Sequence, residues 1–354
     1  MRNAIAGARI APLLGSINMK SSVPHGGNLG SAMQTFGGRR RDWLDLSTGI
    51  NPTPYKFKSP SLDTWAQLPQ QSALAALQEA AANAYGIDSS AALVIGGGTQ
   101  AIIQSLPYCR EVSDVAVVGF TYAEHALAWR RAGHRVTAAA NLEHALQADV
   151  IVLTNPNNPD GRMHTTAELE RTADALRPRD GLLVVDEAFA DVAQEQSIAG
   201  ATNLDGVVVT RSFGKFFGLA GVRLGFAITN PELAARLQAQ LGPWPAAGPS
   251  IAVATTALRD CVWQHDQRVR LVEQCADLCA VLQQAGLNIV GGTALFTLVE
   301  HDNARALWRH LAQRHILTRH FEDRPAWLRF GLANGSGSLT RLTEALSAYF
   351  DEAA

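Results

Sequence analysis

Short apolar runs recur along the first two thirds of the chain, and they limit the possible folds more than any other feature. Asp114–Val118, Val150–Leu153 and Gly181–Val185 are almost uninterrupted by polar residues. Strands of this kind are buried on both faces, as in parallel sheets that helices cover on each side. Further runs of this kind are Ala92–Ile95, Val207–Thr210 and Leu224–Ile228. The pattern predicts an α/β fold with a mostly parallel sheet.

Helical segments separate these runs. Ser72–Tyr85 has helical Ala and Leu spacing, and Gly86 is placed to end that helix. Further helices are expected from about Thr99 and from about Ala123. By contrast, residues 25–60 are rich in Gly, Pro, Ser and Asn and lack periodicity, which predicts an ordered arm without a core element.

The pattern changes after about residue 230, where a small α+β unit is expected. We predict a long helix over 248–285, a strand at Leu295–Val299, a helix at Ala304–Arg314, strands at Ile316–Phe321 and Trp327–Leu332, and a closing helix at Leu339–Phe350. A length of 354 residues suits two domains. The predicted division is 1–50 for an N-terminal extension and arm, 51–240 for a large domain, and 241–354 for an interdomain helix and small C-terminal domain.

Charge and composition exclude several partners. The formal net charge of -2 gives no reason to expect nucleic acid or an anionic membrane surface. No apolar run approaches the roughly 18 residues of a membrane helix. Residues 1–20 are interpreted as a loose extension, with a weak signal peptide as the alternative. The cysteines show no metal-ligand spacing, so we expect no metal and a reduced, cytoplasmic setting; they are Cys109, Cys261, Cys275 and Cys279.

Two loops follow predicted strands and could bind an anion or a ring. Gly96–Gln100 has three glycines and a threonine where a helix begins, so its free backbone N–H groups could hold a phosphate, although such turns are also common without a ligand. Thr154–Gly161 contains two Asn-Pro pairs and a glycine at the carboxyl end of a strand, where α/β sheets bind ligands.

Two charged residues stand out because their surroundings are apolar. Asp186 ends the strand that contains Gly181–Val185, and a buried carboxylate there needs a cationic partner, unless it serves only as a helix cap. Lys215 lies among phenylalanines and glycines, where desolvation lowers an amine's pKa and favours bonding to a carbonyl carbon. Ser212 and Arg223 flank it and could bind a phosphate.

The order of these four segments resembles that of the fold-type I aminotransferase superfamily over residues 25 to 350. The resemblance implies a mostly parallel, seven-stranded large-domain sheet, a small α+β C-terminal domain, and pyridoxal 5'-phosphate as cofactor. Lys215 would be the catalytic residue bonded to the cofactor, and Asp186 would pair with the pyridine nitrogen. The other implied cofactor contacts are Asn158 at the phenolic oxygen, Tyr122 on the ring, and Gly98, Thr99, Gln100, Ser212 and Arg223 at the phosphate.

Within that superfamily the chain is similar to the threonine-phosphate decarboxylases of cobalamin biosynthesis. The similarity rests on His25–Asn28, on Asp45–Pro52 and on Phe189, where the aminotransferases usually have tyrosine. It implies decarboxylation of L-threonine O-3-phosphate to (R)-1-amino-2-propanol O-2-phosphate. A histidinol-phosphate-type aminotransferase is the first alternative. A regulator that binds the cofactor without turnover is the second.

The same resemblance implies a set of substrate-binding residues and a homodimer. Arg329 would bind the substrate carboxylate and Arg319 its phosphate, although each could also form an ordinary surface ion pair. His25 and Asn51 belong to the arm and complete the expected substrate site. Relatives with Tyr-Pro where this chain has Leu68-Pro69 use that tyrosine on the partner subunit's cofactor phosphate, so the chain departs from the pattern there.

Overall fold

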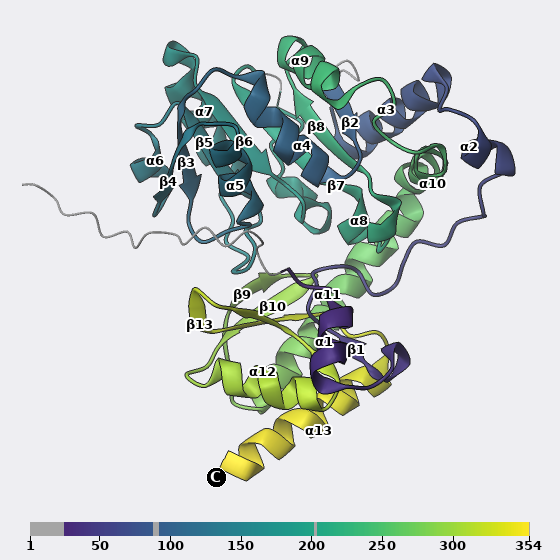
Figure 1. The fold of residues 1–354 in the computed structure, drawn as a ribbon, viewed down its shortest axis with the longest axis vertical. Helices are drawn as coiled ribbons and strands as arrows, with labels where there is room; N and C mark the ends of the chain where they lie inside the picture. Colours follow the sequence, from purple (N-terminus) through teal and green to yellow (C-terminus); the bar gives the residue numbers. More distant parts are fainter. Residues whose placement is uncertain (1–24, 88–91, 202–203, 354) are drawn as a thin grey trace, which may run out of the picture.

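The computed structural model describes residues 25–87, 92–201 and 204–353. Figure 1 shows a large domain in the upper half of the view and a smaller one below it, with the long helix α11 (Cys261–Gln284) running between them. None of the described helices is long and apolar enough to cross a lipid bilayer.

The large domain is built on a seven-stranded sheet in the order β2-β8-β7-β6-β5-β3-β4. β8 is antiparallel to both of its neighbours, and the other pairs are parallel. The predicted fold class is therefore confirmed. The strands are β2 (Leu93–Gly96), β3 (Asp114–Val118), β4 (Arg135–Ala139), β5 (Val150–Thr154), β6 (Leu182–Asp186), β7 (Val207–Ser212) and β8 (Gly225–Thr229).

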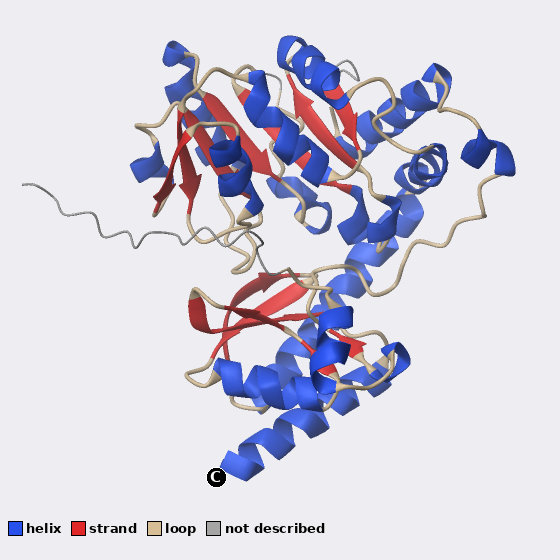
Figure 2. Ribbon diagram, viewed as in Figure 1, coloured by secondary structure: helices blue, strands red, loops and turns tan. Residues whose placement is uncertain are grey.

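Helices cover both faces of this sheet, as Figure 2 shows, and so every residue of the central strands β5 to β8 is buried. Side chains alternate between two cores: Ile151 and Leu153 join one cluster, while Val150 and Val152 join the other. The helices are α2 (Leu62–Ala66), α3 (Gln71–Tyr85), α4 (Thr99–Ser105), α5 (Glu124–Arg131), α6 (Leu142–Ala145), α7 (Thr166–Leu176), α8 (Phe213–Phe216), α9 (Pro231–Leu241) and α10 (Gly248–Arg259).

The small domain has a four-stranded antiparallel sheet in the order β12-β13-β10-β9. The long helix predicted over 248–285 is two helices, because Asp260 ends α10 and caps α11 by accepting a bond from the backbone N–H of Trp263 (3.0 Å). The remaining elements are β9 (Asn288–Thr293), β10 (Phe296–Glu300), β11 (Ile316–Leu317), β12 (Arg319–Phe321), β13 (Arg324–Gly331), α12 (Ala304–Gln313) and α13 (Ser336–Ala353).

The segment expected to be an ordered arm rather than a core element contains a helix and a strand that join the core, so that expectation was wrong. α1 (Leu29–Phe36) and β1 (Leu44–Asp45) pack on the small domain, where β1 pairs in parallel with β11. Ala32 and Trp43 share a buried cluster with Leu317. Burial against a distant part of the chain therefore overrides the weak local pattern. The predicted loose extension at residues 1–20 lies outside the described residues.

Candidate active site

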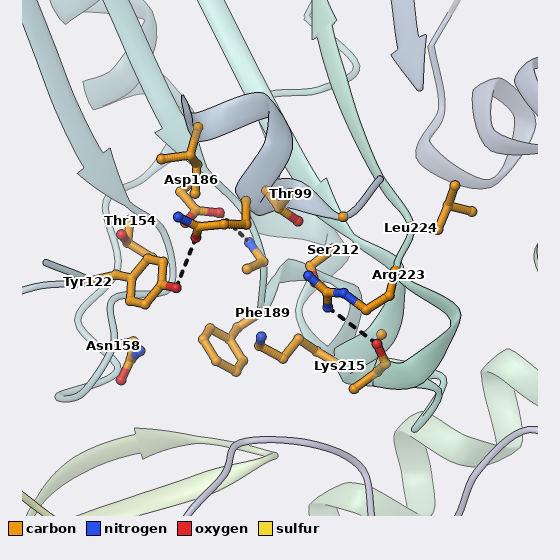
Figure 3. Close-up of a pocket in the computed structure, with 16 residues that line it drawn as sticks. Thr99, Tyr122, Thr154, Asn158, Asp186, Phe189, Ser212, Lys215, Arg223 and Leu224 are labelled. Atoms are coloured by element: carbon orange, nitrogen blue, oxygen red, sulfur yellow. Dashed lines mark hydrogen bonds between the residues drawn. The ribbon is translucent and has the colours of Figure 1, made fainter. Parts of the chain in front are cut away.

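A pocket lies at the carboxyl ends of three neighbouring strands. Thr154 ends β5, Asp186 ends β6 and Ser212 ends β7, and all three side chains line it. Figure 3 shows Asp186 on one side of the pocket, Lys215 on another, and Ser212 near Arg223. The pocket is lined by Gly98, Thr99, Gln100, Ile103, Tyr122, Thr154, Asn158, Asp186, Ala188, Phe189, Ser212, Gly214, Lys215, Ala220, Arg223 and Leu224.

Asp186 is only 3% exposed, and hydrogen bonds fix both of its oxygens. Oδ2 lies 2.8 Å from Nε2 of His125, while Oδ1 accepts from the hydroxyl of Thr210 (3.0 Å) and the N–H of Ala188 (3.1 Å). Burial alone would raise the pKa of this carboxyl, but the bonds from His125 and Thr210 and the charges of His125 and Lys215 outweigh burial and lower it. The site therefore contains a stable buried anion.

Lys215 approaches the pocket from the short helix α8. Its Nζ lies 5.7 Å from the centre of the Phe189 ring. Burial lowers the pKa of the amine; the positive charges of Arg329 and Arg223 lower it further, against the opposing effect of Asp186. A larger share of the amine is thus neutral, the form that attacks a carbonyl carbon.

A buried ion-pair network supports the strand that leads to Lys215. On β7, Arg211 donates to Glu187 (2.8 Å) and to Asp191 (2.7 Å), and its guanidinium stacks on the ring of Tyr85. All three charged side chains are almost completely buried. Breaking such a network by removing one partner is costly, so it fixes the end of β7 in place.

The groups expected to bind a phosphate meet at one end of the pocket. Gly98 begins α4 with a φ of +88°, and a Cβ there would lie 2.8 Å from Nη2 of Arg223. A side chain at Gly98 would therefore displace the guanidinium. Thr99 and Ser212 line the same pocket. The glycine lets a helix N-terminus, an arginine and two hydroxyl-bearing residues lie close together.

Tyr122 and Gln100 are bonded to each other in the pocket. The hydroxyl of Tyr122 donates to Oε1 of Gln100 (3.0 Å), as a dashed line in Figure 3 marks, and Nε2 of Gln100 donates to Glu124 (3.0 Å). Burial, followed by the charges of Glu124 and Asp186, raises the pKa of Tyr122 to about 12, although Arg223 acts in the opposite direction. The phenol therefore stays protonated near neutral pH.

Arg329 reaches from the small domain to Asn158. Its Nη1 donates to Oδ1 of Asn158, and its Nη2 donates to the carbonyl of Ser47 (2.9 Å). Its Nε is buried without a hydrogen-bond partner among the described residues. Burial, followed by the charge of Arg319, lowers its pKa. Arg319 lies directly opposite Arg329 in the β12–β13 ladder, so the two side chains share one face.

None of the four predicted substrate residues is among those that line the pocket, and the two arginines lie on the small-domain sheet. The side-chain NH₂ of Asn51 donates to the backbone carbonyl of Phe216 (2.8 Å), and the backbone N–H of Asn51 donates to the carbonyl of Lys215 (2.9 Å). Asn51 therefore contacts the backbone that carries the lysine. His25 lies at the rim, where its Nε2 is 3.3 Å from Glu124 and its ring is 5.8 Å from that of Tyr122.

His125 and Glu124 were missed by sequence analysis. Both follow Tyr122 in the first turn of α5, but their partners Asp186 and Gln100 are distant in sequence. A histidine one helical turn after Tyr122, the tyrosine expected to contact the cofactor ring, was the available signal. Among the described residues, no group of three or more His, Cys, Asp or Glu side chains is arranged to bind a metal.

Comparisons with known proteins find relatives over nearly the whole chain. A model of the aminotransferase class I and II family matches residues 41–346. A threonine-phosphate decarboxylase from Sinorhizobium sp is 40% identical over 336 residues, which cover 93% of this chain and 99% of that protein. Another threonine-phosphate decarboxylase, from Pseudomonas aeruginosa, is 43% identical over 334 residues, which cover 94% of this chain and 99% of that protein.

Solved structures show the same fold at low sequence identity. The histidinol-phosphate aminotransferase from Sinorhizobium meliloti, in complex with pyridoxal-5'-phosphate, superposes with a TM-score of 0.77 at 20% identity, covering 97% of this chain and 100% of that one. The L-threonine-O-3-phosphate decarboxylase from Porphyromonas gingivalis superposes with a TM-score of 0.73 at 20% identity, and the match covers 86% of this chain and 99% of that one. These likenesses support the fold of the chain.

Proposed function

Because the chain belongs to the aminotransferase class I and II family, we propose that it is a pyridoxal-phosphate-dependent lyase that decarboxylates L-threonine O-3-phosphate. The product is (R)-1-amino-2-propanol O-2-phosphate, and the proposed role is in cobalamin biosynthesis. The two decarboxylases that are 40% and 43% identical to the chain over nearly its whole length support this choice of reaction.

The residues present fit pyridoxal phosphate. The pocket offers a buried amine in Lys215 and a buried carboxylate in Asp186, and Gly98 leaves room for the guanidinium of Arg223 beside a helix N-terminus. An aldehyde, a pyridine nitrogen and a phosphate match these three groups in kind. Lys215 would hold the aldehyde carbon, Asp186 the ring nitrogen, and Thr99, Ser212 and Arg223 the phosphate. Tyr122 would cover the ring, and Asn158 would bind its phenolic oxygen.

Bound there, the cofactor would supply an electron sink for the bond that breaks at the substrate's α-carbon. The chain's residues orient the substrate and move protons. The low pKa of Asp186 keeps a negative charge in place to stabilise a protonated ring nitrogen. The amine of Lys215 would donate a proton to the substrate's α-carbon as a general acid.

The arginine pair is the observation that carries the substrate assignment. Like charges directly opposite in an antiparallel ladder repel, yet Arg319 and Arg329 occupy such positions. Arg329 is 6% exposed, and among the described residues no carboxylate offsets the effect of burial and of Arg319 on it. An amino acid with a second anionic group would place its carboxylate at Arg329 and its phosphate at Arg319, and so would offset the repulsion between the two cations.

We also infer a homodimer. Leu62, Trp65 and Leu68, in and just after α2, are 60% to 80% exposed. α2 packs against the start of α10, since a Cβ on Gly248 would lie 2.3 Å from the carbonyl oxygen of Thr64. Contiguous exposed apolar side chains are typical of interfaces. The free cysteines of the described chain support a cytoplasmic location.

The test is to supply L-threonine O-3-phosphate to the cofactor-loaded protein. We expect release of CO₂ and formation of the amino-propanol phosphate, with no consumption of a keto-acid acceptor. Lys215→Ala should abolish the reaction, and borohydride should no longer fix the cofactor to the peptide that contains position 215. Transamination of histidinol phosphate without CO₂ release would overturn the proposal. A bound cofactor that reacts with no amino acid phosphate would indicate a regulator.

A further inference from the structure

Four side chains form a continuous line of polar contacts from the rim of the pocket to its interior. His25 Nε2 lies 3.3 Å from Oε1 of Glu124, whose Oε2 accepts a bond from Nε2 of Gln100 (3.0 Å). Oε1 of Gln100 then accepts from the hydroxyl of Tyr122 (3.0 Å). The line joins the segment before α1 to α5, α4 and the pocket. Glu124 lies between His25 and Gln100 in this line and has no role in the proposed reaction.

The negative charge of Glu124 determines which group donates and which accepts in each hydrogen bond of the line. An ionised carboxylate only accepts hydrogen bonds, so Gln100 must turn its NH₂ group toward Glu124 and its carbonyl oxygen toward Tyr122. Tyr122 must then be the donor. Glu124 lies in the first turn of α5, next to the N-terminal end of the helix. Its side chain is only 12% exposed.

This arrangement gives Gln100 a role other than the phosphate contact that its sequence motif implies. The side-chain amide is engaged at both ends, by Glu124 and by Tyr122. If Gln100 binds the cofactor phosphate, the free groups are the backbone N–H in the first turn of α4 and the second amide hydrogen. The side chain instead connects Glu124 to Tyr122.

We propose that Glu124 is a positioning residue that acts through Gln100 to hold Tyr122 over the cofactor ring, and that its contact with His25 links the segment at the pocket rim to this ring. The inference rests on the proposed function only in placing the cofactor beneath Tyr122. Loss of the carboxylate charge frees Gln100 to rotate its amide, so Tyr122 loses a fixed acceptor.

The test is a double-mutant cycle with Glu124→Gln and Tyr122→Phe, read out by the dissociation constant of pyridoxal phosphate and by visible circular dichroism of the bound cofactor. A hydrogen bond to a charged group contributes about 1.5 kcal/mol or more, which corresponds to about tenfold in affinity. We expect Glu124→Gln to weaken cofactor binding about tenfold and to change the dichroism. In the Tyr122→Phe background the same change should have less than about a twofold effect.

Glu143→Gln is the matched control, because Glu143 is an exposed glutamate in the first turn of α6 and shares only this position in a helix with Glu124. It should leave both readouts unchanged. Effects of Glu124→Gln and Tyr122→Phe that simply add would overturn the proposal, as would an equal effect of Glu143→Gln. If Glu124→Gln does not fold, Glu124→Asp, which keeps the charge but retracts it, should give the same non-additive loss.

Failure of this proposal is distinguishable from failure of the proposed function. Cofactor affinity and dichroism are measured without substrate. They report on Glu124 even if no CO₂ is released. Conversely, decarboxylation can proceed in a protein whose Glu124 and Tyr122 prove to be uncoupled.

Discussion

His125 is the residue on which the ionisation of Asp186 most depends. Its ring nitrogen lies 2.8 Å from the buried carboxylate and offsets the burial that would otherwise raise the carboxyl pKa. We expect His125→Ala to lower kcat/KM at neutral pH about 10- to 100-fold, the size of a lost hydrogen bond to a charged group.

The pH profile tests the cause of that loss. Because the pKa of Asp186 is lowered in the folded protein, the active anion is present at neutral pH and is lost as pH falls through that low pKa. Without His125 the pKa rises, so the acid limb of the kcat/KM profile should move to higher pH. A limb that stays in place would show that His125 affects the site by another route.

Arg319 should distinguish substrates by their second anionic group. Since it lies opposite Arg329 but is assigned to the phosphate, Arg319→Ala should raise the KM for threonine phosphate about tenfold or more. The inhibition constant of unphosphorylated L-threonine should change by less than about twofold in Arg319→Ala. Arg329→Lys, which removes a bidentate contact to the carboxylate, should weaken both ligands equally. Equal effects of Arg319→Ala on both ligands would contradict the assignment.

Sequence alone could place Lys215, Asp186 and Asn158 because each lies in a short motif next to a buried strand. It could not place Glu124 or His125, because their importance depends on side chains brought close only by the fold. Sequence also could not show that Asn51 bonds to backbone beside Lys215 and does not line the pocket.

The junction between α10 and α11 depends on the side chain of Asp260. One oxygen caps α11 through Trp263, and the other accepts from the hydroxyl of Tyr55 (3.1 Å). We expect Asp260→Ala to lower the free energy of unfolding by about 1–3 kcal/mol in urea titrations. Tyr55→Phe, which removes only the hydroxyl contact, should cost about 0.5–1.5 kcal/mol. If Asp260→Ala were no worse than Tyr55→Phe, the cap would contribute nothing.

Two strands that sequence analysis missed, β4 and β9, share a physical character. β4 is an edge strand with three exposed residues among its five, and β9 contains two glycines and no buried residue. Neither has the continuous apolar run that revealed β5 to β8. β4 and β9 are held by ladder bonds to a neighbouring strand, and a single sequence does not display those bonds.

The exposed apolar side chains around α2 should determine the oligomeric state. Light scattering of the intact protein should give the mass of a dimer, and Trp65→Glu should give that of a monomer at low micromolar concentration, because burying an unpaired charge at an interface is costly. Val290→Glu, on the outer strand β9, is the control and should leave the mass unchanged. A monomeric starting protein would contradict the inferred dimer.

The pairing of β1 with β11 has a consequence for how the protein is made. Leu44 leaves the ribosome early, yet its partner Ile316 emerges only after the whole large domain has been synthesised. The large domain can fold while translation continues, but the small one must wait for both of its separated parts. Ser47 follows β1 directly, and its carbonyl accepts a hydrogen bond from Arg329, which is also made late in translation. A newly made chain therefore cannot form the bond between Arg329 and Ser47 until β13 has left the ribosome, although Ser47 itself was made much earlier.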